Sequence, residues 1–216
     1  MKKAAIFDLD GTLSDSIQSM KICTDEAVAP YGYGPFTEEQ YKYFVGDGAA
    51  NLIKRALIAG GDEKLEHFDE AFAKYKELFS KGCTYGIKTY DGIPELLKEL
   101  KNRGMKIAVL SNKPHAQTID VIETLFGKGY FDAIQGQKDG VPIKPSPDGV
   151  YQILEQLGLK IEDIVYLGDT STDMKTGKNA GAFTVGVLWG FRDRKELEEN
   201  HADAVIAHPL ELLELL

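Results

Sequence analysis

The stretch AAIFDLDGT, residues 4–12, decides the fold that we predict for this chain. Its first part, Ala4 to Leu9, is a short apolar run of the kind that forms a buried β-strand. Two carboxylates, Asp8 and Asp10, stand at its end, where burial is costly unless a partner compensates them. A divalent cation is one such partner, and magnesium prefers hard oxygen ligands. The alternative is a solvated turn with incidental acids. The apolar strand before it and the permissive Gly11 after it weaken that alternative.

Further apolar runs alternate with helical patterns along the rest of the chain. The runs typical of strands are Lys106–Leu110, Ile164–Leu167, Phe183–Val187 and Ala204–Ile206, and the helical patterns include Pro94–Lys101, Ala116–Leu125 and Ser146–Leu157. Strands that alternate with helices predict parallel pairing. We therefore expect an α/β fold with a doubly wound, Rossmann-like parallel sheet. Sheets of this kind bind ligands at the carboxyl ends of their strands.

The interval from Asp15 to Gly86 interrupts this alternation. Its helical patterns are separated by glycine and proline and lie at Gln18–Val28, Glu38–Phe44, Ala49–Ile58 and Phe68–Ser80. We expect residues 1–14 and 87–216 to form the α/β core and residues 15–86 to form a small helical domain inserted after the first strand. Such an insert resembles a lid, although helices that only pad the core are equally compatible with the composition.

A second pair of acids follows the predicted strand Ile164–Leu167. Asp169 and Asp173 belong to the sequence Gly168-Asp169-Thr170-Ser171-Thr172-Asp173. Two acid pairs at the ends of two parallel strands indicate a shared metal site. A competing interpretation makes Thr172 or Asp173 the cap of a helix over Met174–Ala180, and both roles can hold together.

Two weaker signals lie between these acid pairs. Ser111 and Asn112 follow the predicted strand Lys106–Leu110, where hydroxyl and amide groups are natural donors to phosphate oxygens. They are equally common as ordinary turn residues. Lys144 stands in a loop stiffened by Pro145 and Pro147, although a single lysine is usually a solvated surface charge.

Composition excludes several classes of protein. The net charge of −9 over 216 residues argues against broad contact with nucleic acid. No stretch approaches the roughly 20 apolar residues of a membrane span. The two cysteines, Cys23 and Cys83, have no CxxC partner and are expected to be reduced. Because the N-terminal apolar run is too short for a signal peptide, we expect a cytoplasmic protein.

Taken in order, the DxDGT element, the serine, the lysine and the GDxxxD element resemble the haloacid dehalogenase superfamily over nearly the whole chain. The stretch Phe7–Ser16 and the later segments Gly186–Phe191 and Ala202–Ile206 are similar to its phosphoglycolate phosphatase branch. The resemblance implies that Asp8 is a nucleophile that becomes phosphorylated and also binds Mg²⁺. It implies that Asp10 protonates the leaving alcohol and then deprotonates the attacking water.

The resemblance assigns further roles. The backbone carbonyl of Asp10 and the carboxylate of Asp169 would complete the metal ligands, and Asp173 would hold a water of the metal or orient Lys144. Ser111, the Asn112 amide and Lys144 would bind the transferred phosphoryl group, and Thr12 would orient Asp10.

The helical insert then resembles the small cap of this superfamily, which closes over the site. Its loop Gly46-Asp47-Gly48 matches a place where such caps contact the substrate, although the two glycines are equally consistent with plain turns. A cap of this size favours a small phosphorylated metabolite as partner, with 2-phosphoglycolate or a sugar phosphate as examples. A monomer and a homodimer are both open.

The presence of Asp10 also bears on other activities known in this superfamily. A dehalogenase and a phosphonatase are disfavoured, because both lack the second acid that Asp10 provides. A sugar phosphomutase keeps both acids and stays open. A non-catalytic binding module that retained the fold is the alternative from a different class, and the intact set of candidate catalytic residues argues against it.

Overall fold

The computed structural model describes residues 2–216. The chain divides into two compact units. The residues up to Asp15 join Lys88–Leu216 to form the first unit, and Ser16–Ile87 form the second. We describe each unit separately.

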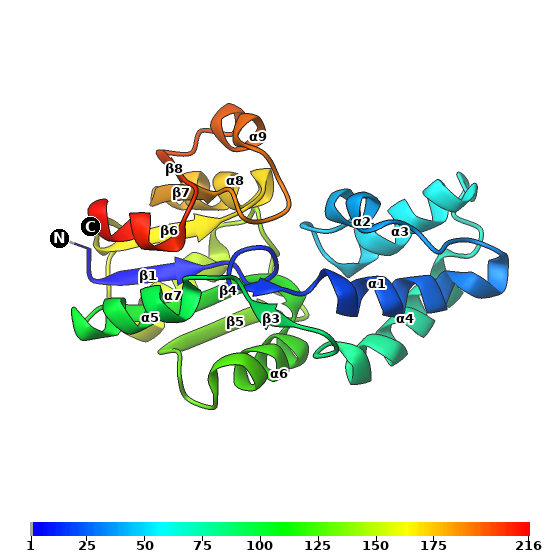
Figure 1. The fold of residues 1–216 in the computed structure, drawn as a ribbon, viewed down its shortest axis with the longest axis horizontal. Coiled ribbons are helices and arrows are strands. Elements are labelled where there is room, and N and C mark those ends of the chain that lie inside the picture. Colours follow the sequence, from blue (N-terminus) through cyan, green and yellow to red (C-terminus); the bar gives the residue numbers. More distant parts are fainter. Residues whose placement is uncertain (1) are drawn as a thin grey trace. The chain divides into compact units, whose positions relative to one another are not determined.

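The first unit is built on a six-stranded sheet in the order β5-β4-β1-β6-β7-β8 (Figure 1). The strands are β1 (Ala4–Phe7), β4 (Lys106–Pro114), β5 (Ala133–Gln137), β6 (Ile164–Gly168), β7 (Phe183–Val187) and β8 (Ala204–Ile206). Every neighbouring pair is parallel. The predicted α/β fold is therefore confirmed, and β1, the strand that leads into Asp8, lies inside the sheet.

The side chains of the sheet alternate between its two faces, as the period of a β-strand requires. One face contributes Ile6, Leu110 and Tyr166 to a core cluster that also contains Val150 and Ile153 from α7. All four residues of β1 are fully buried. The continuous apolar runs seen in the sequence thus reflect strands covered on both faces.

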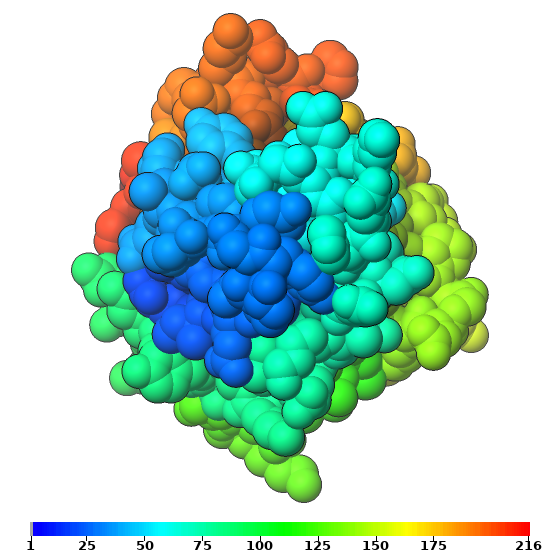
Figure 2. Space-filling model, turned by 90° about the vertical axis from the view of Figure 1, so that its right-hand side faces the viewer, coloured from blue at the N-terminus to red at the C-terminus, as the bar shows by residue number. Residues whose placement is uncertain are grey.

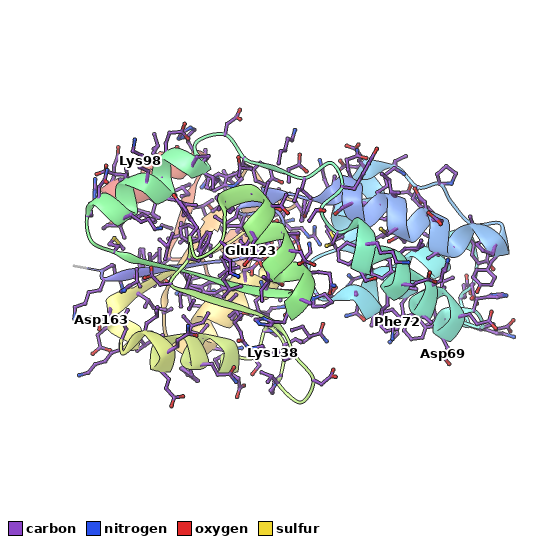
Figure 3. All side chains as sticks on the ribbon, turned by 90° about the horizontal axis from the view of Figure 1, so that it is seen from below. Asp69, Phe72, Lys98, Glu123, Lys138 and Asp163 are labelled. Atoms are coloured by element: carbon purple, nitrogen blue, oxygen red, sulfur yellow. The ribbon has the colours of Figure 1, made fainter. Side chains whose placement is uncertain are left out.

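Helices of the first unit connect the strands. They are α5 (Ile93–Asn102), α6 (His115–Phe126), α7 (Asp148–Leu157), α8 (Ser171–Ala180) and α9 (Arg194–Glu199), with short 3-10 turns η2 (Ile161–Asp163) and η3 (Pro209–Glu214). Helix α5 shows how they pack: it buries Leu96, Leu97 and Leu100, while Lys98 is exposed on its outer side (Figure 3). Two short antiparallel strands, β2 (Ser14–Asp15) and β3 (Lys88–Thr89), stand where the first unit is interrupted.

The second unit is helical. It consists of α1 (Ile17–Val28), η1 (Ala29–Tyr31), α2 (Glu38–Phe44), α3 (Ala49–Gly60) and α4 (Phe68–Gly82). Helix α1 packs on α4, and Figure 2 shows their dark blue and cyan surfaces side by side. Helix α2 begins at a capping box in which Thr37 and Gln40 satisfy each other's backbone amides. Its Tyr41 is fully buried and forms an aromatic cluster with Phe36 and Phe44.

Within the described part of the chain, we find no helix with the length and apolar character needed to cross a membrane.

The central strand gives a direct test of this core. Ile6 is fully buried in β1, so replacing it by alanine removes apolar contacts and leaves a cavity. We expect Ile6→Ala to lower the free energy of unfolding by about 2–5 kcal/mol, measured by denaturant unfolding. Leu210→Ala is the matched control, because Leu210 is 38% exposed, and it should cost less than about 1 kcal/mol. Similar losses in the two variants would contradict the sheet position given to Ile6.

Candidate active site

The candidate site residues follow three adjacent strands of the sheet. Asp8 and Asp10 come after β1, and Asp169 and Asp173 come after β6. Ser111 and Asn112 belong to the last part of β4, which runs beyond the predicted end at Leu110 and changes register there. Because parallel strands end at one edge, the sheet brings these residues together.

Three of the predicted acids form one buried cluster. Carboxylate oxygens of Asp8, Asp169 and Asp173 all lie within 4.8 Å of one another. Asp10 is not a member of this side-chain cluster. Its Oδ1 atom instead lies 2.5 Å from the Nζ atom of the buried Lys113.

The positively charged side chain of Lys144 forms ion pairs with two acids of the cluster. Its Nζ atom lies 2.8 Å from Asp8 Oδ1 and 2.7 Å from Asp173 Oδ1, and the side chain is almost fully buried. The side chain of Asn112 fixes the backbone at this position: its Nδ2 donates to the Lys144 carbonyl at 3.1 Å, and its Oδ1 accepts from the Lys144 N–H at 2.9 Å. Lys144 is therefore a built part of the site and not a solvated surface charge.

Asp173 is oriented by the start of helix α8. The cap residue is Thr170, not Thr172 or Asp173, and Asp173 takes the third helical position of the capping box. Its Oδ2 accepts from the Thr170 hydroxyl at 2.7 Å and from the Thr170 N–H at 3.1 Å. The Tyr166 hydroxyl donates to Oδ1 at 3.3 Å. The Asp173 carboxylate therefore belongs both to the capping box of helix α8 and to the acid cluster.

Asp169 has one donor on each carboxylate oxygen. The Thr12 hydroxyl donates to Oδ1 at 3.1 Å, and the backbone N–H of Phe191 donates to Oδ2 at 2.8 Å. The family resemblance assigned Thr12 to Asp10, whereas the hydrogen bond in the structure goes to Asp169. Gly11 lies so close that a Cβ atom there would approach Asp169 Oδ2 to 2.3 Å.

Burial dominates the electrostatics of the cluster. It raises the pKa of Asp8 well above the usual range, and the nearby Asp173 adds to this, while Lys144 acts in the opposite direction. Burial and Asp173 together raise the pKa of Asp169 to about 7. For Lys144, burial lowers the pKa, but the carboxylates of Asp173 and Asp8 outweigh it and hold the value well above normal. With all three acids ionised, the cluster would carry more negative charge than Lys144 balances, which is why burial shifts Asp8 and Asp169 toward their protonated forms.

This donor set fits a magnesium ion. Carboxylate oxygens are hard ligands of the type that Mg²⁺ takes, usually with one or two carboxylates and several waters. Each oxygen of Asp169 keeps a lone pair beyond its single hydrogen bond. A divalent cation would also balance the excess charge that burial makes costly.

Sequence reasoning missed several neighbours of these acids. Lys113, the partner of Asp10, directly follows Ser111 and Asn112, but a lysine among polar residues carries no signal of burial. Tyr166 was recognised only as a residue of an apolar strand, and nothing in the sequence indicated that its hydroxyl donates to Asp173. Phe191 contacts Asp169 through its backbone N–H, so the identity of its side chain gives no sign of this contact.

The predicted contact loop of the second unit has an internal structure of its own. Gly46 and Gly48 have φ values of 120° and 98°, a region that favours glycine. Asp47 forms two hydrogen bonds with the guanidinium of Arg55, at 2.5 and 2.6 Å, and accepts from Asn51 Nδ2 at 3.1 Å. The Asp47 carboxylate is thus engaged within its own unit.

Comparison with known proteins matches this arrangement to one family. Residues 5–187 match the family model described as haloacid dehalogenase-like hydrolase. A phosphoglycolate phosphatase of Aquifex aeolicus is 31% identical over 214 residues, covering 99% of this chain and 96% of the relative. One from Yersinia pestis is 31% identical over 215 residues, covering 98% and 91%.

Solved structures agree. A protein of Lactobacillus delbrueckii subsp. bulgaricus, solved as a candidate phosphoglycolate phosphatase, has a TM-score of 0.92 and 30% identity, covering 100% of this chain and 98% of its own. A hydrolase of the haloacid dehalogenase-like family from Streptococcus pneumoniae shares the fold with a TM-score of 0.87 at 23% identity, covering 99% and 98%. With its sheet, its buried acids and a family match over most of its length, the chain belongs to the haloacid dehalogenase-like hydrolases.

Proposed function

We propose that this hydrolase is a magnesium-dependent phosphatase that cleaves a small phosphate monoester through a phosphorylated Asp8. The observation that carries the proposal is the position of Asp8, whose carboxylate lies in a buried cluster with Asp169 and Asp173 and 2.8 Å from Lys144. The relatives named phosphoglycolate phosphatase support 2-phosphoglycolate or a similarly small ester, such as a sugar phosphate, as the substrate.

Asp8, Asp169 and the backbone carbonyl of Asp10 would hold the Mg²⁺ ion, with Asp173 nearby. When bound, the ion would offset the charge of the phosphoryl oxygens and of the cluster.

The residues of the chain divide the chemistry between them. An Asp8 oxygen attacks phosphorus, and the bond from phosphorus to the ester oxygen breaks. Asp10 gives its proton to the departing alcohol, then takes a proton from the water that attacks the phosphorylated Asp8. This second step releases inorganic phosphate and restores the Asp8 carboxylate. Lys144, the Ser111 hydroxyl and the Asn112 N–H bind the phosphoryl oxygens as charge redistributes.

Hydrogen bonds already present favour this division. Asp8 Oδ1 accepts from the Leu9 N–H at 2.6 Å and lies 2.8 Å from Lys144 Nζ, so the nucleophile has a fixed orientation. Lys113 holds Asp10 at a separate position. The two acids thus have different partners, as different roles require.

The second unit, Ser16–Ile87, would act as the cap, and the loop Gly46–Gly48 would contact the substrate. We further propose that the protein works in the cytoplasm.

The first test is a screen of phosphorylated metabolites with the wild type and with Asp8→Asn. The substitution keeps the shape of the side chain but removes the nucleophile, so we expect kcat to fall by at least about 10⁴-fold on every substrate. Asp139→Asn changes an exposed loop aspartate and serves as the matched control. Released phosphate and the far-ultraviolet circular dichroism spectrum are measured together. Turnover by Asp8→Asn at the wild-type rate would defeat the mechanism.

A second test separates the two steps through Asp10. An aryl phosphate has a good leaving group and needs little help from an acid, whereas hydrolysis of the phosphorylated enzyme still needs a base. With Asp10→Asn we therefore expect about one equivalent of phenol to be released rapidly, followed by slow turnover. The trapped acyl phosphate should react with hydroxylamine. Equal loss of both phases, with no trapped phosphate, would assign Asp10 a different role.

The third test uses pH and metal. Because Asp169 has a pKa of about 7 in the folded protein and 3.8 as its ordinary value, the folded state binds more protons between these values. Without metal, the contribution of Asp169 to stability should therefore fall as pH rises from about 4 to 7. Mg²⁺ favours ionised carboxylates, so its stabilising effect should grow over the same interval.

The measurement is the thermal unfolding midpoint at about pH 5 and about pH 7.5, with EDTA and with Mg²⁺. Asp169→Asn should weaken both trends and should make hydrolysis require more Mg²⁺. Midpoints that do not respond to Mg²⁺ at either pH would argue against a metal at this cluster.

A further inference from the structure

The segment Trp189–Glu196 follows strand β7 and reaches two loops of the acid cluster. The indole Nε1 of Trp189 donates to the backbone carbonyl of Thr12 at 2.9 Å. The backbone N–H of Phe191 donates to Asp169 Oδ2 at 2.8 Å. One short segment thus contacts both the loop after β1 and the loop after β6.

Close packing at Gly190 keeps this segment against Asp169. A Cβ atom at Gly190 would lie 2.4 Å from both the Asp169 Cβ and the Gly11 carbonyl oxygen. Only a residue without a side chain fits there, so the backbone of the segment forms one wall around Asp169.

Glu196 anchors the far end of the same segment. Its Oε1 accepts from the backbone N–H of Ser171, the first residue of helix α8, at 3.0 Å. Its Oε2 lies 3.2 Å from Nε of Arg192. Glu196 therefore ties the segment to the junction of β6 and α8, which carries Asp169 and Asp173.

We propose that Trp189–Glu196 is a clamp that positions Asp169 for its divalent ion, with Trp189 and Glu196 as the positioning residues. The polar contacts given above for these two side chains go to neighbours of the acid cluster. Trp189 acts through Thr12, whose hydroxyl donates to Asp169 Oδ1, and Glu196 acts through Ser171 and the segment itself. The inference rests on the proposed metal-dependent function.

The physical reason is the cost of ordering a ligand. With both carboxylate oxygens held, Asp169 loses little freedom when the ion binds. Removing a group that orients a metal ligand without binding the metal itself commonly weakens metal affinity by about 10–100-fold. The clamp therefore acts on the affinity for Mg²⁺ and leaves the reacting groups intact.

The experiment compares Mg²⁺ binding by wild type, Glu196→Ala, Glu196→Gln and Trp189→Phe. Calorimetry gives the affinity for every protein, and the emission of Trp189, the sole tryptophan, gives it again for those that retain it. We expect Glu196→Ala to weaken Mg²⁺ binding by about 10–100-fold. Glu196→Gln keeps an acceptor for the Ser171 N–H and should recover part of the loss. Trp189→Phe keeps a ring without the donor and should bind Mg²⁺ several-fold more weakly.

Glu198→Ala is the matched control, because Glu198 lies on the same helix, is exposed and pairs with Arg194. The unfolding midpoint without metal reports any loss of fold, and excess Mg²⁺ should return kcat of the clamp variants to near the wild-type value. Affinities of Glu196→Ala and Trp189→Phe within twofold of the control would overturn the clamp, as would a kcat that excess Mg²⁺ does not restore. If Glu196→Ala does not fold, Trp189→Phe decides by the same criteria. A wild type that binds no Mg²⁺ would instead overturn the proposed function.

Discussion

The burial of three carboxylates within 4.8 Å of one another is the constraint on which the rest of this structure depends. A buried charge without partners is costly, and like charges at this distance add repulsion. Lys144 supplies one positive charge, shared between Asp8 and Asp173. Hydroxyl and amide donors fixed by the fold supply further compensation, and the remaining negative charge creates the demand for a cation.

The same constraint explains which residues can stand around the cluster. Side chains are excluded at Gly11 and Gly190 because a Cβ atom would collide with Asp169, and at Gly168 because it would approach the Cβ of Asp173 to 2.2 Å. Only Gly11 of these three also has a positive φ. For Gly168 and Gly190, the requirement is therefore space for a carboxylate and not a special backbone conformation.

Much of the fold was predictable because the sheet is buried on both faces and its strands read as apolar runs. The strands over Phe183–Val187 and Ala204–Ile206 have the predicted bounds. Strand β5 was missed because its sequence, AIQGQ, contains two apolar residues and a glycine and gives no such run. Helix α9 was missed because its sequence, RKELEE, has one apolar residue. Apolar runs therefore identify even the edge strand β8, but a strand or a surface helix with few apolar residues gives no such signal.

The candidate site was predictable to the extent that each residue sits at a strand end. The strand order brings Asp8, Asp169 and Asp173 together, and the sequence marks all three positions. The pairing of Asp10 with Lys113 was not predictable, because it depends on how far β4 continues and where its register changes. Contacts made by backbone groups, such as the Phe191 N–H, leave no mark on the sequence at all.

The contacts around the acid cluster and those around Asp47 belong to different units of the chain. Every hydrogen bond described around the acid cluster is made within the first unit, among loops that the parallel sheet holds at one edge. The Asp47 carboxylate, by contrast, is paired with Arg55 inside the second unit. Under the proposed function, the groups that would bind and transfer a phosphoryl group are therefore held by contacts of the first unit. With the second unit in its proposed role as the cap, substitutions there would alter substrate preference and leave the first-unit contacts of Asp8 intact. The acids of the cluster can be identified from the sequence because buried carboxylates require compensating partners, whereas residues that select a substrate carry no comparable electrostatic constraint.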